Sequence, residues 1–189
     1  KGTPYIYQGE ELGMTNRKCR DFSEFRDIEI KNAYRDFVGG GILDEETMLK
    51  FVNAIGRDNA RFPMHWDDSD NAGFTTGTPW ISVNENYKKI NAAAQVNDPD
   101  SIFSYYKKLI ELRHQMEIIV YGVYKSKAIE HPDVFAYTRT FGEEKLFVVC
   151  NFREQEMDFT LEDGFTGDEK VLISNYDDVV KTENGIYLR

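Results

Sequence analysis

The spacing of hydrophobic residues changes near residue 117, and this change divides the chain into two parts. Before it, apolar residues recur every three or four positions in several segments, a period that predicts amphipathic helices. After it, short apolar runs alternate with polar residues at a period of two, which predicts β-strands. We therefore expect a helical, loop-rich part over residues 1–117 and an all-β part over residues 118–189.

Three helices are expected in the first part. One ends near Val38, because consecutive glycines follow it. Asp44 is placed as the N-cap of a second helix over 45–55, which has acidic residues in its first turn and an apolar face. Asp98 is placed as the N-cap of a third helix over 99–115, with a proline at the first helical position.

The second part is predicted to hold six short strands separated by turn sequences. Short strands at this spacing are typical of an antiparallel sandwich or a Greek-key sheet. The expected strands cover residues 119–124, 134–140, 145–152, 157–161, 170–174 and 185–188.

A short β-type run at residues 4–7 leads into an acidic, glycine-containing turn at residues 8–13. This pattern is typical of a strand in a parallel α/β barrel, where ligand groups lie just past the C-terminal end of each strand. A complete barrel needs about 250 residues, so one strand of a barrel is the most that this run predicts. A plain strand and turn is the alternative.

Residues 57–77 follow neither period, although they hold arginines, acids and amides beside a proline and Trp66. An ordered loop of this composition suits a polyhydroxylated ligand. Charged groups bond to hydroxyls, and an aromatic face covers the C–H side of a sugar. The alternative is a surface Ω-loop closed by an Arg–Asp pair. Composition leaves both interpretations open.

The charge of the chain narrows the class of partner. A formal net charge of -10 argues against nucleic acid and anionic membranes, and no apolar run is long enough for a transmembrane helix. Cys19 and Cys150 lie far apart, and Cys150 sits in an apolar run, so a reduced, buried thiol is favoured over a disulfide. This fits a cytoplasmic location. The chain starts without Met, and we expect both of its ends to be cut from a longer sequence.

Catalytic chemistry is harder to place from the residues alone. There is no metal-ligand spacing, no phosphate loop and no nucleophile elbow, so we assign no metal and no cofactor. The histidines, including His65, have no evident partners, and the charges at 26–29 have a solvated rim as their plainer interpretation. Three acid pairs are conceivable glycosidase carboxylates, and spacing does not choose among them. They are Glu10/Glu11, Asp27/Glu29 and Asp67/Asp68.

Several long motifs resemble oligo-1,6-glucosidase-like enzymes of the α-amylase-type glycoside hydrolase family. The sequence GTPYIYQGEELGMTN at 2–16 resembles their eighth-strand segment, and 57–67 with 71–75 resemble the loop that follows. Residues 98–113 resemble their last barrel helix, and residues 118–189 resemble their C-terminal β-domain. The resemblance covers the whole chain in order.

The resemblance implies an α/β plus all-β fold. Residues 1–117 would form the last strand–helix segment of a (β/α)8 barrel, and residues 118–189 a shortened antiparallel β-sandwich domain. It implies the C-terminal part of a retaining exo-acting α-glucosidase that hydrolyses α-1,6 bonds in isomalto-oligosaccharides or dextran-derived sugars. In the family the nucleophilic aspartate, the acid–base glutamate and the metal loop lie upstream of the eighth strand. We therefore assign no catalytic residue here and expect the missing N-terminal catalytic portion to be the partner.

The same resemblance suggests roles for residues around the loop. Arg57 resembles the arginine that helps to hold the 4-hydroxyl of the terminal glucose, and Glu29 resembles the glutamate that contacts the next sugar. Asp58 and Arg61 are expected to hold the loop, and Trp66 to pack it.

The sequence differs from many relatives at two positions, and two alternative functions stand beside the α-1,6-glucosidase. Many relatives have Thr where Phe62 stands and Gln where His65 stands, which bears on the inner packing of the loop. Trehalose-6-phosphate hydrolases share nearly all of these motifs. A chain acting alone would be a non-catalytic carbohydrate-binding fragment. We expect such a fragment to be inactive, with residues 1–16 mispaired, disordered or borrowed by a partner.

Overall fold

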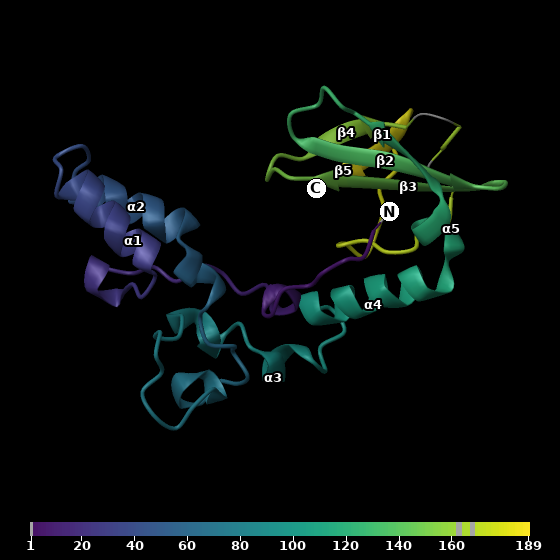
Figure 1. The fold of residues 1–189 in the computed structure, drawn as a ribbon. Helices are drawn as coiled ribbons and strands as arrows, with labels where there is room; N and C mark the ends of the chain where they lie inside the picture. Colours follow the sequence, from purple (N-terminus) through teal and green to yellow (C-terminus); the bar gives the residue numbers. More distant parts are fainter. Residues whose placement is uncertain (1, 162–163, 167–168) are drawn as a thin grey trace. The chain divides into compact units, whose positions relative to one another are not determined.

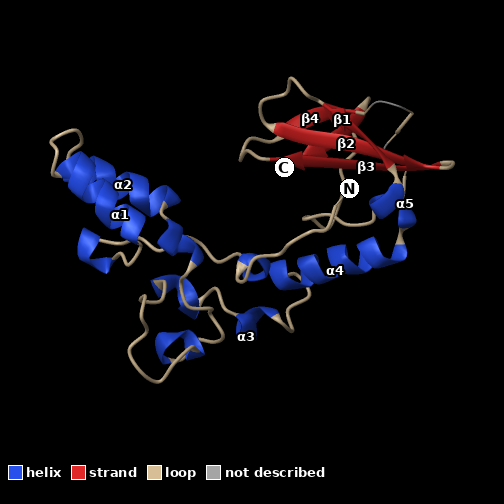
Figure 2. Cartoon of the chain, viewed as in Figure 1, coloured by secondary structure: helices blue, strands red, loops and turns tan. Residues whose placement is uncertain are grey.

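A computed structural model describes residues 2–161, 164–166 and 169–189. The chain forms two compact units, one over Pro4–Lys107 and the other made mainly of Lys108–Arg189. The division falls within the longest helix, α4 (Ile102–Gln115). Among the described residues, every strand lies in the second unit (Figure 2).

Two helices and the loop before them form the core of the first unit (Figure 1). Helix α1 (Ile28–Ala33) continues into a π-helical turn at Tyr34–Val38 and then stops at the glycines, as the sequence predicts. Helix α2 spans Glu45–Ile55, and its predicted cap is confirmed because the Asp44 carboxylate accepts a hydrogen bond from the Thr47 amide at 2.8 Å. The buried side chains of this core are Cys19, Phe25, Ile30, Met48 and Val52.

Short helical turns connect the other segments of this unit. Four-residue α3 spans Ala92–Gln95. The 3-10 turns lie at Glu10–Leu12, Phe22–Glu24, Arg57–Ala60, Asp70–Gly73 and Glu85–Lys88.

Helix α4 begins at Ile102, later than predicted. The carboxylate of Asp98 accepts from the Asp100 amide at 2.9 Å, which closes a separate turn. The Ser101 hydroxyl donates to the Asp98 carbonyl at 2.7 Å and accepts from the Ser104 amide at 3.1 Å. Ser101 therefore acts as the N-terminal cap that the sequence interpretation gave to Asp98.

In its described residues, the second unit contains a three-stranded and a two-stranded antiparallel sheet. Strand β2 (Val134–Phe141) lies between β1 (Val123–Lys127) and β3 (Glu144–Asn151). Strand β4 (Met157–Thr160) pairs with β5 (Gly185–Leu188). Four of the six predicted strands are confirmed, those that correspond to β2 through β5, and the antiparallel arrangement is as expected.

The prediction of a strand at 119–124 is wrong at its start, because α5 (Glu117–Tyr121) is helical and β1 begins at Val123. Ile118 is buried, and the guanidinium of buried Arg139 lies against the carbonyls of Ile118 and Ile119. These contacts satisfy carbonyl groups at the end of the helix, so tertiary packing outweighs the strand preference of the Ile-Ile-Val run.

Replacing Arg139 with leucine is expected to lower the free energy of unfolding by about 1–3 kcal/mol, because helix carbonyls lose a buried donor. Arg153 in the same unit is the matched control, since it pairs with Asp133 at 2.6 Å while its side chain remains largely exposed. Arg153→Leu should change the stability little. Denaturant unfolding of both variants checks this, and equal effects would contradict the role of Arg139.

Residues 4–7 form no strand, because a strand needs a partner and none is described in their unit, as expected for a single barrel strand without its neighbours. Two other predictions are wrong. Residues 170–174 form no strand. Cys150 is free but exposed on β3, whereas the buried thiol is that of Cys19. Within the described ranges, no helix has the length and apolar character to cross a membrane.

Candidate functional site

Asp58 lies at the buried base of a cluster formed by residues 26–29 and 57–61. Its side chain is 2% exposed. One carboxylate oxygen accepts from the backbone amides of Arg26 at 2.6 Å and Asp27 at 3.0 Å, and the other lies 3.2 Å from Nη1 of Arg61. The expectation that Asp58 and Arg61 hold the loop is confirmed. We call the following residues the arginine–carboxylate cluster: Asp27, Glu29, Arg57, Asp58 and Arg61.

Asp27 connects the two segments a second time. It is the N-cap of α1, where Oδ1 accepts from the Glu29 amide at 2.7 Å. Its Oδ2 lies 2.5 Å from Nη1 of Arg61 and 3.6 Å from Nε of Arg57. Burial alone would raise the pKa of Asp27. The hydrogen bond from Arg61, the Glu29 amide and the charges of both arginines outweigh burial and leave the pKa below its usual value.

Arg57 and Glu29, the two residues expected to contact sugar, lie together at the exposed edge of this cluster. Nη1 of Arg57 is 2.6 Å from Oε1 of Glu29, and the two side chains are 56% and 67% exposed. The hydrogen bond to Glu29, together with the charges of Glu29 and Asp27, raises the pKa of Arg57 above its usual value. The cluster therefore presents a guanidinium and a carboxylate to solvent above two buried carboxylates.

The interpretation of residues 26–29 as a solvated rim is wrong for Asp27, whose side chain is 2% exposed. Sequence reasoning missed its bridging role. The signal available was its position directly before a helix, where aspartate acts as a cap. Its contact with Arg61 spans 34 residues of sequence and carries no local signal.

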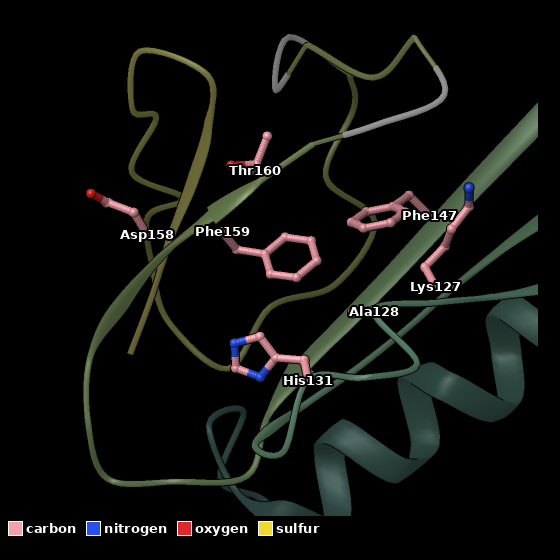
Figure 3. Close-up of a pocket in the computed structure, with 7 residues that line it drawn as sticks. All are labelled: Lys127, Ala128, His131, Phe147, Asp158, Phe159 and Thr160. Carbon is pink, nitrogen blue, oxygen red and sulfur yellow. The ribbon is translucent and has the colours of Figure 1, made fainter.

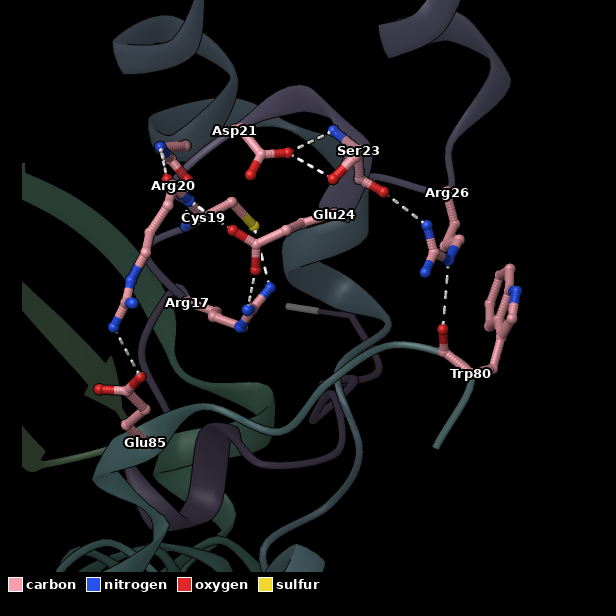
Figure 4. Close-up of polar contacts among 10 residues, drawn as sticks. Arg17, Cys19, Arg20, Asp21, Ser23, Glu24, Arg26, Trp80 and Glu85 are labelled. Carbon is pink, nitrogen blue, oxygen red and sulfur yellow. Dashed lines mark hydrogen bonds and ion pairs between the residues drawn. The ribbon is translucent and has the colours of Figure 1, made fainter. Parts of the chain in front are cut away.

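A second polar network holds the segment that leads to the cluster (Figure 4). The Arg17 guanidinium pairs with Glu24 and lies 3.2 Å from Sγ of Cys19. Arg26 donates to the Ser23 carbonyl at 2.7 Å and to the Trp80 carbonyl at 3.3 Å. The side chain of Arg26 thus connects the segment before α1 to the loop that contains Trp80. The backbone amide of Arg26 binds Asp58.

His65 and Phe62 are buried and pack the inside of the loop at 57–77. They are the two positions at which this sequence differs from many members of the family that it resembles. Nδ1 of His65 lies 2.8 Å from the Ile90 carbonyl, a partner that was not evident from the sequence. Burial lowers the pKa of His65, which favours the neutral ring. Trp66 is 52% exposed, so its predicted packing role is not seen in the described chain.

Each of the three acid pairs has at least one carboxylate in a structural contact. Glu10 accepts from the Tyr106 hydroxyl at 2.6 Å, and this hydrogen bond, with burial and the charges of Glu10 and Glu11, raises the pKa of Tyr106 to about 12. Asp27 caps α1, and Asp67 accepts from the Ser69 amide at 2.9 Å. Over the described part of the chain, no group of three or more His, Cys, Asp or Glu side chains could hold a metal ion.

The second unit contains a cavity of about 270 Å³ between strands of the two sheets. The rings of Phe147 and Phe159 lie 6.2 Å apart beside His131, whose Nδ1 accepts from two backbone amides (Figure 3). The side chains of Asp158 and Thr160 point away from the His131 ring (Figure 3). The polar groups around this cavity do not converge on one point, in contrast to the arginine–carboxylate cluster.

Two family models match the chain in sequence order. The model described as alpha amylase, catalytic domain, matches residues 1–122, and the model described as alpha-amylase SusG C-terminal domain matches residues 134–189. The boundary that the sequence analysis places near residue 117 stays a prediction.

Similar proteins cover nearly the whole chain. An oligo-1,6-glucosidase of Bacillus cereus is 52% identical over 186 residues, which are 98% of this chain and 33% of that protein. A trehalose-6-phosphate hydrolase of Bacillus subtilis (strain 168) is 47% identical over 93% of this chain and 32% of its own length. The crystal structure of Bacillus licheniformis trehalose-6-phosphate hydrolase superposes with a TM-score of 0.91 at 46% identity, covering all of this chain and 34% of the other. The chain therefore spans about one third of the length of these relatives.

Proposed function

The chain belongs to the α-amylase family, and from this premise we propose that it is the C-terminal part of a retaining exo-acting α-glucosidase. Its substrates would be isomalto-oligosaccharides or dextran-derived sugars, cleaved at α-1,6-glucosidic bonds. High identity to oligo-1,6-glucosidases over nearly the entire chain supports this substrate class.

The exposed guanidinium of Arg57 is the observation that carries the proposal. It lies 3.6 Å from the buried carboxylate of Asp27 and 2.6 Å from the exposed carboxylate of Glu29, while its side chain remains 56% exposed. An arginine fork in such a position suits hydroxyl recognition by charge-assisted hydrogen bonds. We assign it to the 4-hydroxyl of the terminal glucose, a contact that would block longer chains at that end and enforce exo action. Glu29 would contact the next sugar.

The catalytic groups would come from the N-terminal portion of the complete protein. In a retaining mechanism, one carboxylate attacks the anomeric carbon and another protonates the leaving oxygen, then activates water. The residues of this chain would supply binding and orientation. A cytoplasmic location stays part of this proposal.

Trehalose-6-phosphate hydrolysis is the second candidate function. It is favoured by the identity to the Bacillus subtilis hydrolase and by the close superposition on the Bacillus licheniformis enzyme. Both reactions release a terminal glucose, so Arg57 would serve either one. The two differ in the group beyond the scissile bond, which is a phosphorylated sugar only in trehalose 6-phosphate.

The complete protein is expected to release glucose from isomaltose, whereas the 189-residue chain alone should release none. The physical reason is that retaining hydrolysis needs a carboxylate pair at about 5 Å separation on either side of the bond, and this proposal places that pair outside the chain. A coupled glucose assay on both proteins, with intact mass as the identity control, checks this. Turnover by the isolated chain would show that local carboxylates catalyse.

A further inference from the structure

We propose that Asp27 is a positioning residue that holds Arg57 and Glu29 in one fixed arrangement, a role that rests on the proposed function of those two residues. The two oxygens of its carboxylate face different partners. Its Oδ1 accepts from the Glu29 amide at 2.7 Å, and its Oδ2 lies 3.6 Å from Nε of Arg57. Both sugar-contacting candidates are therefore attached to the same buried group.

The contact with Glu29 acts through the backbone. As the N-cap of α1, Asp27 fixes the first turn of the helix, and this turn decides where the Glu29 side chain leaves the backbone. Helix ends fray when their amides lack a partner. Without the cap, the Glu29 carboxylate would be free to drift relative to the guanidinium.

The contact with Arg57 acts through charge. An exposed ion pair such as Arg57–Glu29 holds long side chains weakly, because solvent screens it and ordering costs entropy. The buried carboxylate of Asp27 faces the Nε edge of the guanidinium, where its charge is screened less. Arg61, at 2.5 Å from the same oxygen, keeps that carboxylate ionised and in place. The Nη groups of Arg57 are then directed toward Glu29 and solvent.

Asp58 has a different role, although it is equally buried. Its carboxylate contacts the amides of Arg26 and Asp27 and the guanidinium of Arg61. It supports the scaffold, whereas Asp27 touches both functional residues. Asp58 therefore contributes to the stability of the fold, whereas Asp27 fixes the positions of Arg57 and Glu29.

The test replaces Asp27 with asparagine and, separately, with serine in the complete protein. Both residues keep an N-cap acceptor but remove the negative charge that faces Arg57. We expect kcat/KM for isomaltose to fall about 10-fold, less than the roughly 100-fold loss that a 1 Å misplacement can cause. The matched control is Asp44→Asn, which changes the cap of α2 in the same way and should leave kcat/KM unchanged.

A double-mutant cycle with Arg57→Ala separates positioning from general stability. If Asp27 acts through Arg57, the loss from Asp27→Asn shrinks toward nothing in the Arg57→Ala background. Equal losses in both backgrounds would overturn the proposal while leaving the function of Arg57 intact. If Arg57→Ala alone has no effect, the proposed function itself fails. If neither Asp27 variant folds where Asp44→Asn does, Asp27 is a structural residue and the proposal fails.

Discussion

Replacing Arg57 with alanine in the complete protein is expected to lower kcat/KM for isomaltose about 100-fold. This magnitude corresponds to losing a hydrogen bond that involves a charged donor in a binding site. Arg57→Lys should lie between wild type and Arg57→Ala, because lysine keeps the charge but loses the planar fork. Initial-rate kinetics with isomaltose measure both effects.

Arg20→Ala is the matched control for this prediction. Arg20 is also an exposed, ion-paired arginine of the same unit, 3.5 Å from Glu85, but it lies outside the arginine–carboxylate cluster. Its replacement should leave kcat/KM unchanged. Equal losses in the Arg57 and Arg20 variants would remove the special role of Arg57.

Asp58→Ala is expected to produce the largest loss of stability in the first unit, about 3–5 kcal/mol. The substitution removes one acceptor from two backbone amides and leaves Arg61 without one of its two carboxylate partners. Buried donors that lose their acceptor pay the cost of desolvation in full. Chemical denaturation of the complete protein measures the change in the free energy of unfolding.

Asp36→Ala provides the comparison, since Asp36 pairs with Arg35 at 2.8 Å while both side chains stay largely exposed. This substitution should have little effect, because surface ion pairs contribute little to stability. A loss for Asp58→Ala no greater than that for Asp36→Ala would mean that the cluster does not depend on its buried base.

Elements with a strong local pattern were predictable from the sequence. The helix Glu45–Ile55 and its Asp44 cap follow from acidic residues before an amphipathic period, and both are confirmed. Strands β2 to β5 follow from alternation bounded by turn residues. In these segments the residues that decide the structure are close neighbours in sequence.

Predictions failed where distant residues decide the structure. The Ile-Ile-Val run in α5 has strand propensity, but Arg139 from β2 supplies donors that favour a helical end. The run at residues 4–7 has strand propensity too, but it stays unpaired, as expected for one barrel strand, because no neighbouring strand is described in its unit. Local propensity contains no information about the contact with Arg139 or about the presence of a neighbouring strand.

The candidate site also contains residues that the sequence identified and a contact that it did not. Arg57 and Glu29 were named through resemblance, and the structure places them 2.6 Å apart; their sugar contacts stay a prediction. The burial of Asp27 was not predictable from its charged neighbours, because Arg61 creates the environment that keeps the charge in place. A pair separated by 34 residues becomes a contact only through the fold.

The ratio of kcat/KM for isomaltose to that for trehalose 6-phosphate, measured on the complete protein, tests the central claim most directly. The proposed α-1,6-glucosidase should prefer isomaltose, because Glu29 would contact an uncharged second sugar and its carboxylate would repel a nearby phosphate. Intact mass should confirm that the assayed protein is the complete one. A clear preference for isomaltose supports the account, whereas a preference for trehalose 6-phosphate, or turnover of neither sugar, would contradict it.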